Sequence, residues 1–241
     1  MKIAVIPARG GSKRIPRKNI KLFCGKPMIA WSIEAACTSG LFDHIVVSTD
    51  DDEIAEVAKA YGADVPFMRP ADLSDDHTGT STVVAHASEW YRKHGYIADP
   101  VCCIYATAPF VTAVDLQRGL QTLIDTESDF AFSVTSYAFP IQRAIKLSKG
   151  CQVEMFQPEN FNTRSQELEE AYHDAGQFYW GTAEAWLSGK VIFGPNAAAV
   201  KLPRYRVQDI DIAEDWQRAE YLFRALNLET EERNRFIQGT I

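Results

Sequence analysis

The N-terminal segment, residues 2–21, restricts the possible folds more than any other stretch of the chain. It opens with a short apolar run, residues 3–8, which has no helical period and indicates a buried strand. A cationic loop with two adjacent glycines, Gly10 and Gly11, follows this strand. Glycine lets backbone N–H groups approach an anion, and the cations neutralise its charge. A strand that ends in such a loop is therefore typical of α/β proteins that bind phosphate.

The basic character of this loop contrasts with the chain as a whole, whose formal net charge is −7. Its cations are Arg9, Lys13, Arg14, Arg17, Lys18 and Lys21. The contrast favours a dedicated anion site over an ordinary solvated loop, which is the usual explanation of a charge run. The loop is not a Walker A motif, because its Gly-Lys pair precedes Pro27, and the G-x-G-x-x-G dinucleotide fingerprint is absent.

Apolar runs and helical patterns alternate along most of the chain. We expect further strands at residues 43–49, 63–67, 101–106, 129–135, 177–181 and 207–212, and helices at residues 27–39, 52–61, 82–92, 116–124, 214–225 and 229–235. This alternation predicts a single α/β domain, residues 1–241, with a largely parallel sheet and helices on both faces. Residues 136–174 break the pattern and indicate an excursion from the sheet. Such arms often dimerise, so we expect a homodimer.

Composition excludes several classes of function. The acidic balance argues against a general nucleic-acid binder, which is basic overall. No apolar segment reaches the roughly 18 residues that a membrane-spanning helix needs, and the opening apolar run is too short for a signal peptide. The five cysteines lack C-x-x-C spacing, so we expect reduced and mostly buried thiols in a cytoplasmic protein that binds neither nucleic acid nor membrane.

A pair of carboxylates near the C-terminus, Asp209 and Asp211, is the second candidate site. On a strand, residues two apart share a face, so both carboxylates would project together while Ile210 turns to the core. Such a pair suits Mg²⁺, which usually binds one or two carboxylates together with substrate phosphates. A structural role is also compatible with the pattern, because Asp211 and Glu214 resemble a capping pair at the start of a helix.

The segment IPARGGSKRIPRKNIK closely resembles the signature of the CMP-sialic acid synthetase (acylneuraminate cytidylyltransferase) family, with Arg-Gly-Gly-Ser-Lys, then Pro, then Lys-Asn in the same order. The resemblance runs from about residue 3 to residue 222. It is densest in residues 8–21, 69–76 and 209–211. It implies a Rossmann-like nucleotidyltransferase fold, a three-layer sandwich, in which CMP is transferred from CTP to an acidic nine-carbon sugar. It also implies that Asp209 and Asp211 hold Mg²⁺.

The resemblance also assigns residues to the CTP site. The expected CTP-binding residues are Arg9, Gly10, Gly11, Ser12, Lys13, Lys18, Asn19, Arg69, Asp76, Thr78 and Thr80. Among the site residues, Arg9, Lys18 and Asp211 are the expected catalytic groups. The loop at residues 69–82 has a second interpretation, because its Asp, Ser and Thr residues are also typical of helix capping.

The expected sugar-binding residues are Tyr105, Thr107, Arg143, Arg164, His173, Gln177 and Tyr179. Tyr105 and Val111 stand where sialic acid synthetases carry Gln and Arg, which argues against sialic acid. His-Asp-Ala-Gly-Gln replaces the Arg-Pro-Asn-Gly of those enzymes and resembles the branch that activates pseudaminic acid. A second interpretation makes His173 a core or surface residue and places Arg143 and Arg164 in surface ion pairs instead of on the sugar carboxylate.

Four further hypotheses are compatible with the same residues. In three of them the chemistry is unchanged and the acceptor is legionaminic acid, sialic acid or the eight-carbon acid KDO. KDO is disfavoured, because the lysine-rich loop and the pair Lys18-Asn19 follow the sialic-type pattern. The fourth hypothesis is a non-catalytic nucleotide-binding protein of the same fold. It is weakened by the presence of Lys18 and of both carboxylates, Asp209 and Asp211.

Overall fold

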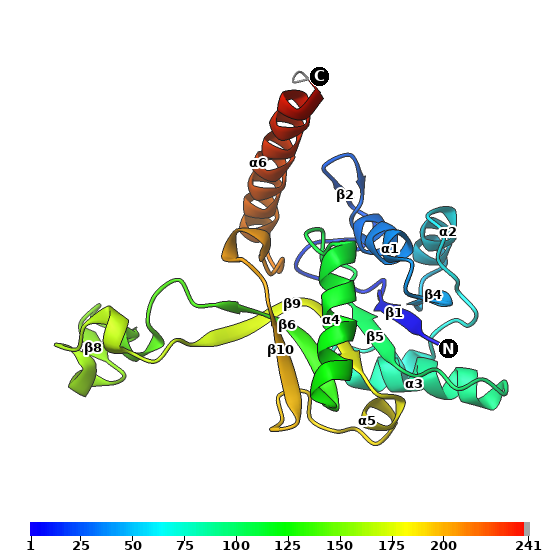
Figure 1. The fold of residues 1–241 in the computed structure, drawn as a ribbon, viewed down its shortest axis with the longest axis horizontal. Coiled ribbons are helices and arrows are strands. Elements are labelled where there is room, and N and C mark those ends of the chain that lie inside the picture. Colours follow the sequence, from blue (N-terminus) through cyan, green and yellow to red (C-terminus); the bar gives the residue numbers. More distant parts are fainter. Residues whose placement is uncertain (239–241) are drawn as a thin grey trace.

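A six-stranded sheet organises the described part of the chain in this computed structural model (Figure 1). The structure describes residues 1–238, with side chains described to residue 228. The strand order is β10 (Ala197–Lys201), β6 (Phe130–Ser136), β9 (Tyr172–Gly181), β5 (Val101–Ile104), β1 (Ile3–Pro7) and β4 (His44–Ser48). β9 runs antiparallel to both of its neighbours, whereas the other pairs are parallel. The predicted largely parallel sheet is confirmed.

Helices cover both faces of this sheet and make a three-layer α/β architecture. The helices are α1 (Met28–Ser39), α2 (Asp52–Ala60), α3 (Thr80–Lys93), α4 (Ala113–Thr126), α5 (Ala183–Leu187) and α6 (Ala213–Gln238). On one face, side chains of α1, α2 and α4 such as Ile33 and Leu116 pack into one core cluster. On the other face, α3 and α5 supply Val84 and Trp186 to a second cluster. The predicted α/β layering is therefore confirmed.

Local sequence signals explain where several helices begin and end. Asp51 caps α2, because its carboxylate accepts a hydrogen bond from the backbone N–H of Ile54 at 3.0 Å. Gly40 ends α1 in the left-handed conformation, with φ of 64°, which glycine adopts at little cost. Gly119 lies on the inner side of α4, where an added Cβ would come within 2.6 Å of the Phe178 ring. Because glycine has no Cβ, this clash does not occur and α4 packs closely on the sheet.

The cationic loop is part of a third core cluster. After β1 the loop passes through a small hairpin, β2 (Leu22–Phe23) with β3 (Lys26–Pro27). Phe23 packs edge-on against Trp216 and Phe223 of α6. α6 thereby ties the N-terminal loop to the C-terminal end of the chain, which brings residues 9–18 near residues 209–211.

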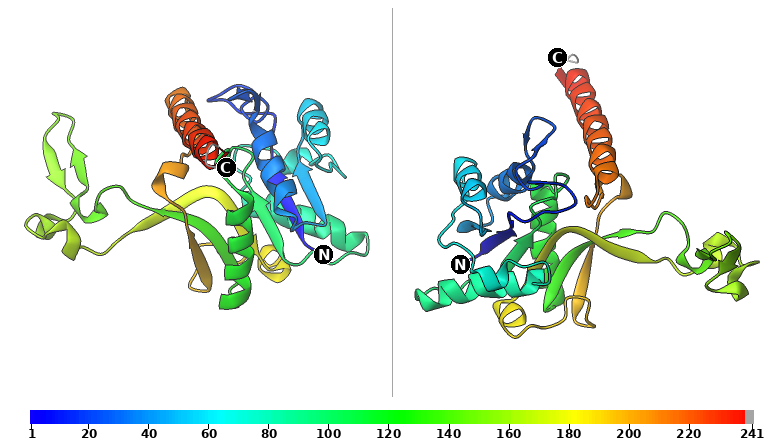
Figure 2. Two further views of the ribbon diagram at one scale, coloured as in Figure 1. Left: turned by 45° about the horizontal axis from the view of Figure 1, so that its top comes forward. Right: turned by 180° about the vertical axis from the view of Figure 1, so that it is seen from behind.

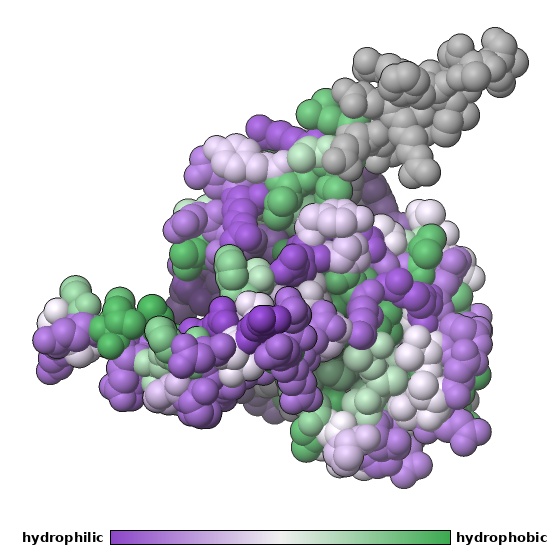
Figure 3. Space-filling model, turned by 60° about the vertical axis from the view of Figure 1, so that its left-hand side comes forward, coloured by the Kyte–Doolittle hydropathy of each residue, from purple (hydrophilic) through white to green (hydrophobic). Residues whose placement is uncertain are grey.

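An arm leaves the sheet within the stretch 136–174, where the sequence pattern breaks (Figures 1 and 2). It contains the hairpin β7 (Ile145–Leu147) and β8 (Val153–Met155) and the short 3₁₀ turns Ile141–Arg143, Pro158–Asn160 and Ser165–Glu167. Several large apolar side chains on it are exposed: Tyr137, Phe139, Ile141, Ile145, Leu147, Val153, Phe156 and Phe161. Apolar patches on this projection are visible in Figure 3.

The structure corrects four expectations about secondary structure. Residues 207–212 form an irregular segment between the 3₁₀ turn Arg204–Arg206 and α6, in which Ile210 is buried in the core cluster with Phe23 and Trp216. Residues 63–67 make one isolated bridge, between Asp64 and Val46, rather than a strand. β10 was not predicted, since its Ala-rich sequence lacks the usual β-branched pattern. The two helices expected at residues 214–225 and 229–235 are one helix, α6.

Two expectations from composition can also be compared with the structure. All five cysteines, which lie in the described part of the chain, are free, but only Cys102 and Cys103 are buried. Cys37 and Cys151 are exposed, so the prediction of mostly buried thiols was wrong. In the described residues, every helix is too short or too polar to cross a membrane.

Candidate functional site

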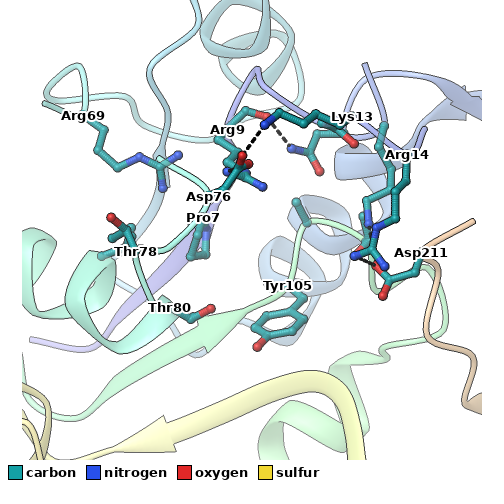
Figure 4. Close-up of a pocket in the computed structure, with 16 residues that line it drawn as sticks. Pro7, Arg9, Lys13, Arg14, Arg69, Asp76, Thr78, Thr80, Tyr105 and Asp211 are labelled. Carbon is teal, nitrogen blue, oxygen red and sulfur yellow. Dashed lines mark hydrogen bonds and ion pairs between the residues drawn. The ribbon is translucent and has the colours of Figure 1, made fainter. Parts of the chain in front are cut away.

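A cavity of about 460 Å³ opens at the carboxyl end of β1, the position where open α/β sheets bind ligands (Figure 4). Twelve of the residues predicted from the sequence line it: Arg9, Ser12, Lys13, Lys18, Asn19, Arg69, Asp76, Thr78, Thr80, Tyr105, Thr107 and Asp211. The loop after β1, the loop before α3, the end of β5 and the segment before α6 supply these residues. Positions far apart in the sequence therefore converge on one cavity.

Glycine allows the N-terminal loop to pass close to the start of α2. The backbone N–H of Gly10 donates to Asp50 Oδ1 at 3.0 Å, and an added Cβ at Gly10 would lie 2.6 Å from Asp51 Oδ2. Gly10 and Gly11 thus form the backbone of the loop and do not themselves line the cavity. Asn19 braces the same loop, because its amide Nδ2 donates to the Arg9 carbonyl at 3.0 Å.

Arg17 anchors the loop and lies outside the cavity. Its guanidinium bonds to both carboxylate oxygens of Asp51, at 2.5 and 2.9 Å, and also pairs with Glu53. The hydrogen bond from Arg17 holds the pKa of Asp51 below its ordinary value. Arg17 itself adopts a positive φ of 54°, which is unusual for a residue with a side chain. This cation therefore has a structural role, unlike Arg14 and Lys18, which line the cavity.

The lining of the cavity carries excess positive charge. Among the described residues that line it, five are cations (Arg9, Lys13, Arg14, Lys18 and Arg69) and two are carboxylates (Asp76 and Asp211). Arg14 was expected as a cation of the loop, but not as a residue of the site. Such a surplus of guanidinium and ammonium groups suits a ligand with several phosphates.

The two carboxylates hold these cations in position. Arg9 Nη1 lies 2.7 Å from Asp76 Oδ1, and Lys13 pairs with the other carboxylate oxygen. On the opposite wall, Arg14 Nη2 lies 2.9 Å from Asp211 Oδ1. The hydrogen bonds from Lys13 and Arg9 keep the pKa of Asp76 below its ordinary value. Each carboxylate therefore pairs with N–H groups that could otherwise bind an anionic ligand.

Arg69 is a buried cation with an unused hydrogen-bonding group. Its side chain is 3% exposed, and its Nη2 has no hydrogen-bond partner among the described residues. That nitrogen lies 3.7 Å from Asp50 Oδ1, which is too long for a hydrogen bond. Burial lowers the pKa of Arg69. Because an unsatisfied buried donor is costly, its position at the cavity wall indicates a ligand with a complementary acceptor.

The floor of the cavity is formed by hydroxyl groups near the end of β5. Tyr105 follows β5, and its hydroxyl interacts with those of Thr80, at the start of α3, and Tyr179 on β9. Burial raises the pKa of Tyr105, so the phenol stays neutral. Thr78 Oγ1 donates to Asp75 Oδ1 at 2.7 Å, which shapes the loop before α3. This hydrogen bond is of the kind expected from the capping interpretation of the loop, and Thr78 also lines the cavity.

The two carboxylates of the predicted metal site face different spaces. Asp211 lines the main cavity, whereas Asp209 lines a second cavity of about 370 Å³. The expectation that both project from one strand face was wrong, because residues 207–212 are irregular. The expected capping pair was also wrong: Asp215, not Glu214, accepts hydrogen bonds from the backbone N–H groups of Asp211 and Ile212, both at 3.0 Å.

Asp209 and Asp211 nevertheless remain close enough to repel each other. Burial and the charge of Asp211 raise the pKa of Asp209. Among the described residues, no group of three His, Cys, Asp or Glu side chains could hold a metal ion by itself. Two neighbouring carboxylates fit a divalent cation that takes its other ligands from a bound phosphate. The chemistry of this donor set therefore fits such a metal, provided that the substrate is present.

The predicted sugar-binding residues are dispersed. His173 lines the second cavity, and Tyr105 and Thr107 line the first. Two others are in the core: Gln177 Nε2 donates to the Arg206 carbonyl at 2.6 Å, and the Tyr179 hydroxyl donates to Asp174 Oδ2 at 2.5 Å. Arg143 and Arg164 lie on the arm, where the Arg143 guanidinium bonds to Thr163 and Ser165. Direct sugar contacts by Gln177, Tyr179 and these arginines remain predictions.

Comparisons with known proteins show the family and the fold of this chain. A family model described as cytidylyltransferase matches residues 3–229. The pseudaminic acid cytidylyltransferase of Campylobacter jejuni subsp. jejuni serotype O:2 is 48% identical over 92% of this chain and 96% of its own length. The N-acylneuraminate cytidylyltransferase A of Danio rerio is 34% identical over 90% of this chain and 49% of its own. A solved CMP:2-keto-3-deoxy-manno-octonic acid synthetase complexed with CTP shares the fold, with a TM-score of 0.68, 17% identity, and coverage of 93% of this chain and 99% of the neighbour.

Proposed function

Because this chain belongs to the cytidylyltransferase family, we propose that it transfers CMP from CTP to pseudaminic acid, a nine-carbon acidic sugar, and releases pyrophosphate. The observation that carries this proposal is the identity of 48% with a pseudaminic acid cytidylyltransferase, extended over 92% of the chain. The family resemblance seen in the sequence is thereby confirmed. The cationic cavity at the end of β1 supplies a site with the charge that a triphosphate requires.

In the proposed reaction, the anomeric hydroxyl of the sugar attacks the α-phosphorus of CTP. A new O–P bond forms, the bond from the α-phosphorus to the oxygen of the β-phosphate breaks, and the proton of the hydroxyl passes to water. Enzymes accelerate phosphoryl-type transfers mainly by positioning the reactants and neutralising charge. We assign Arg9 and Lys13 to the triphosphate. The backbone N–H groups of Gly10 and Ser12 already donate within the protein, to Asp50 Oδ1 and to the Gly10 carbonyl, both at 3.0 Å. Lys18 would neutralise charge at the α-phosphate or on the departing pyrophosphate.

The nucleoside would lie against the cavity wall that contains Arg69, Thr78 and Thr80. We assign Arg69 to an acceptor on cytosine, because its unpartnered Nη2 is buried at this wall. Thr78 and Thr80 line the same side and would contact the nucleoside through their hydroxyl groups. Asn19 and Asp76 also line the cavity, and we assign them mainly to holding Arg9 and Lys13 in place.

Cytidylyltransferases of this kind generally use a divalent metal, and we propose Mg²⁺ held by Asp209 and Asp211. When bound, the metal would supply a Lewis acid that neutralises phosphate charge and acidifies the sugar hydroxyl. Lys18 lies beside this position, with its Nζ 3.6 Å from Asp211 Oδ1. Removing divalent metal with a chelator should therefore abolish pyrophosphate release, and adding Mg²⁺ should restore it.

The test of the function is pyrophosphate release from CTP and Mg²⁺ with a panel of pseudaminic, legionaminic, N-acetylneuraminic acid and KDO. Turnover with pseudaminic acid at a kcat/KM well above the other sugars is the expected result. Turnover with another sugar would overturn the sugar assignment and keep the nucleotide chemistry. An absence of turnover with all four sugars, with CTP still bound, would favour a non-catalytic nucleotide-binding role.

We further propose that the protein is a homodimer in the cytoplasm. The arm exposes apolar side chains such as Phe139 and Phe161, and burial of these against a second copy would remove them from water. The two exposed free cysteines, Cys37 and Cys151, suit a reducing compartment. Light scattering coupled to size-exclusion chromatography measures the assembly directly.

A further inference from the structure

Asp50, in the loop after β4, contacts two separate parts of the candidate CTP site and is not one of the described residues that line its cavity. Its Oδ1 accepts a hydrogen bond from the backbone N–H of Gly10 at 3.0 Å. The same oxygen lies 3.7 Å from Arg69 Nη2. One carboxylate oxygen therefore lies between the loop assigned to the triphosphate and the arginine assigned to the nucleoside.

Backbone hydrogen bonds on either side of Asp50 fix its position relative to both partners. The Ala8 N–H donates to the Ser48 carbonyl at 3.0 Å, so the contact between β1 and β4 continues to the start of the N-terminal loop. The Arg69 N–H donates to the carbonyl of the buried Thr49 at 2.7 Å. The main chain next to Asp50 is therefore held by the sheet, although the side chain itself is 30% exposed.

The buried guanidinium of Arg69 needs a negative charge nearby. Its Nε donates to the neutral Ser74 Oγ at 3.2 Å, and among the described residues Asp50 is the only carboxylate that pairs with it. Burial lowers the pKa of Arg69 most, the charge of Asp50 opposes this shift, and the charge of Arg9 adds to it. Because a buried charge without a partner is costly, Arg69 should leave its position when Asp50 loses its charge.

We propose that Asp50 is a positioning residue of the CTP site, whose charge holds the Arg69 guanidinium and whose oxygen holds the N-terminal loop at Gly10. This inference rests on the proposed function, because it takes the cavity to bind CTP. Asp50 acts through these two neighbours and does not touch the nucleotide. The two contacts use different properties of the carboxylate, since an N–H group needs only an acceptor oxygen whereas Arg69 needs a negative charge. Substitutions at this position can therefore separate them.

The first test is calorimetric titration with CTP and with inorganic pyrophosphate, each in the presence of Mg²⁺. Asp50→Asn keeps an acceptor oxygen for Gly10 and removes the charge, so the Kd for CTP should rise about tenfold while the Kd for pyrophosphate changes less than about twofold. Asp50→Ala removes both properties, so the Kd should rise about tenfold for both ligands.

Asp52→Asn is the matched control, because Asp52 is exposed in the first turn of α2, two residues farther along the chain. It should leave both dissociation constants within about twofold of the wild-type values. A general loss of structure in Asp50→Asn would weaken the two ligands equally, and that result would overturn the proposal. Wild-type affinity of Asp50→Asn for CTP would also overturn it.

The second test asks whether Asp50 acts through Arg69, by a double-mutant cycle with Arg69→Met. If it does, adding Asp50→Asn to Arg69→Met should raise the Kd for CTP less than about twofold further, because both changes remove one interaction. Additive effects would show that Asp50 acts elsewhere and would refute its positioning role with the function intact. The titrations need no sugar, so a wild-type protein that bound CTP but turned over none of the sugar acids would refute the proposed activity instead.

Discussion

Lys18 reaches across the cavity at the carboxyl end of β1 to the segment that carries Asp209 and Asp211. Its Nζ lies 2.6 Å from the Ile210 carbonyl and 3.6 Å from Asp211 Oδ1. Lys18→Met keeps the length of the side chain and removes its charge, so we expect kcat to fall at least about tenfold with little change in CTP affinity. Single-turnover kinetics and calorimetric titration with CTP measure the two quantities.

Lys21→Met is the control for that variant, because Lys21 lies on the same loop but contacts the Trp216 ring, with Nζ 4.5 Å from its centroid, outside the cavity. It should retain kcat within about twofold. Wild-type turnover by Lys18→Met would remove this ammonium group from the chemistry and leave it the role of bridging the two loops.

Arg69 provides a different test, because its buried guanidinium has an unused donor. Arg69→Lys keeps the charge and loses the planar fork, so we expect the KM for CTP to rise about tenfold while kcat changes less. Arg92→Lys, which changes an exposed arginine on α3 that pairs with Glu89, serves as the control. An unchanged KM for CTP would place the nucleoside against another wall.

At the scale of secondary structure, a buried ion pair ties α4 to the segment that precedes the two carboxylates. Asp115 near the start of α4 accepts hydrogen bonds from Arg206 Nη1 at 2.6 Å and Nη2 at 3.1 Å. Thr112 donates to the same carboxylate at 2.6 Å. Burial by itself would raise the pKa of Asp115, but these hydrogen bonds and the charges of Arg206 and Arg118 outweigh it and lower the pKa.

Asp115→Asn should lower the free energy of unfolding by about 3 kcal/mol at pH 7, because Arg206 would lose its buried partner. The sign of the pH dependence follows from the lowered pKa. The stabilisation is complete above the ordinary Asp pKa of about 3.9 and is lost as the pH falls through the lower folded-state value. Urea unfolding followed by circular dichroism at pH 7 and pH 3 measures the difference between wild type and variant.

That difference should be smaller at pH 3 than at pH 7, because pH 3 lies below the ordinary Asp pKa. Asp125→Asn, near the end of the same helix, is the control and should change the free energy of unfolding by less than about 0.5 kcal/mol. A difference that stayed constant with pH would mean that the hydrogen-bond geometry, and not the charge of Asp115, stabilises this junction.

At the scale of the whole molecule, the apolar side chains that the arm exposes to water have no explanation within a single chain. The arm projects from the sheet (Figures 1 and 3). The side chains of Phe139 and Phe161 on it are 82% and 70% exposed. We expect the double variant Phe139→Glu, Phe161→Glu to be monomeric where the wild type is dimeric, because charges at an apolar interface would be desolvated. Analytical ultracentrifugation at several protein concentrations measures the mass.

Ile97→Glu is the matched control, since Ile97 is 77% exposed and lies in a loop outside the arm. It should leave the mass unchanged. A wild-type protein that sediments as a monomer, or a double variant that remains dimeric, would mean that the arm does not form the contact between two copies.

Signals carried by residues close in sequence were sufficient to predict many of the strands and helix ends of this protein. The apolar runs predicted β1, β4, β5 and β6, and the Asp51 cap and Gly40 marked helix ends, because strand and helix formation depend on residues close in sequence. The glycine-containing cationic loop after β1 likewise predicted where a cavity lined by cations lies, although anion binding there stays a prediction. Twelve predicted residues converge on one cavity, since loops at the carboxyl ends of adjacent strands meet at one edge of the sheet.

Other features depend on contacts between distant segments, and here local patterns misled or were silent. The alternation in residues 207–212 predicted a strand, yet it arises because Ile210 enters the core cluster around Phe23 and α6. The antiparallel direction of β9, the burial of Arg69 and the separation of Asp209 from Asp211 into two cavities were decided only by tertiary packing. Local sequence therefore determined which segments become strands, helices and loops, whereas long-range packing determined which side chains share a cavity.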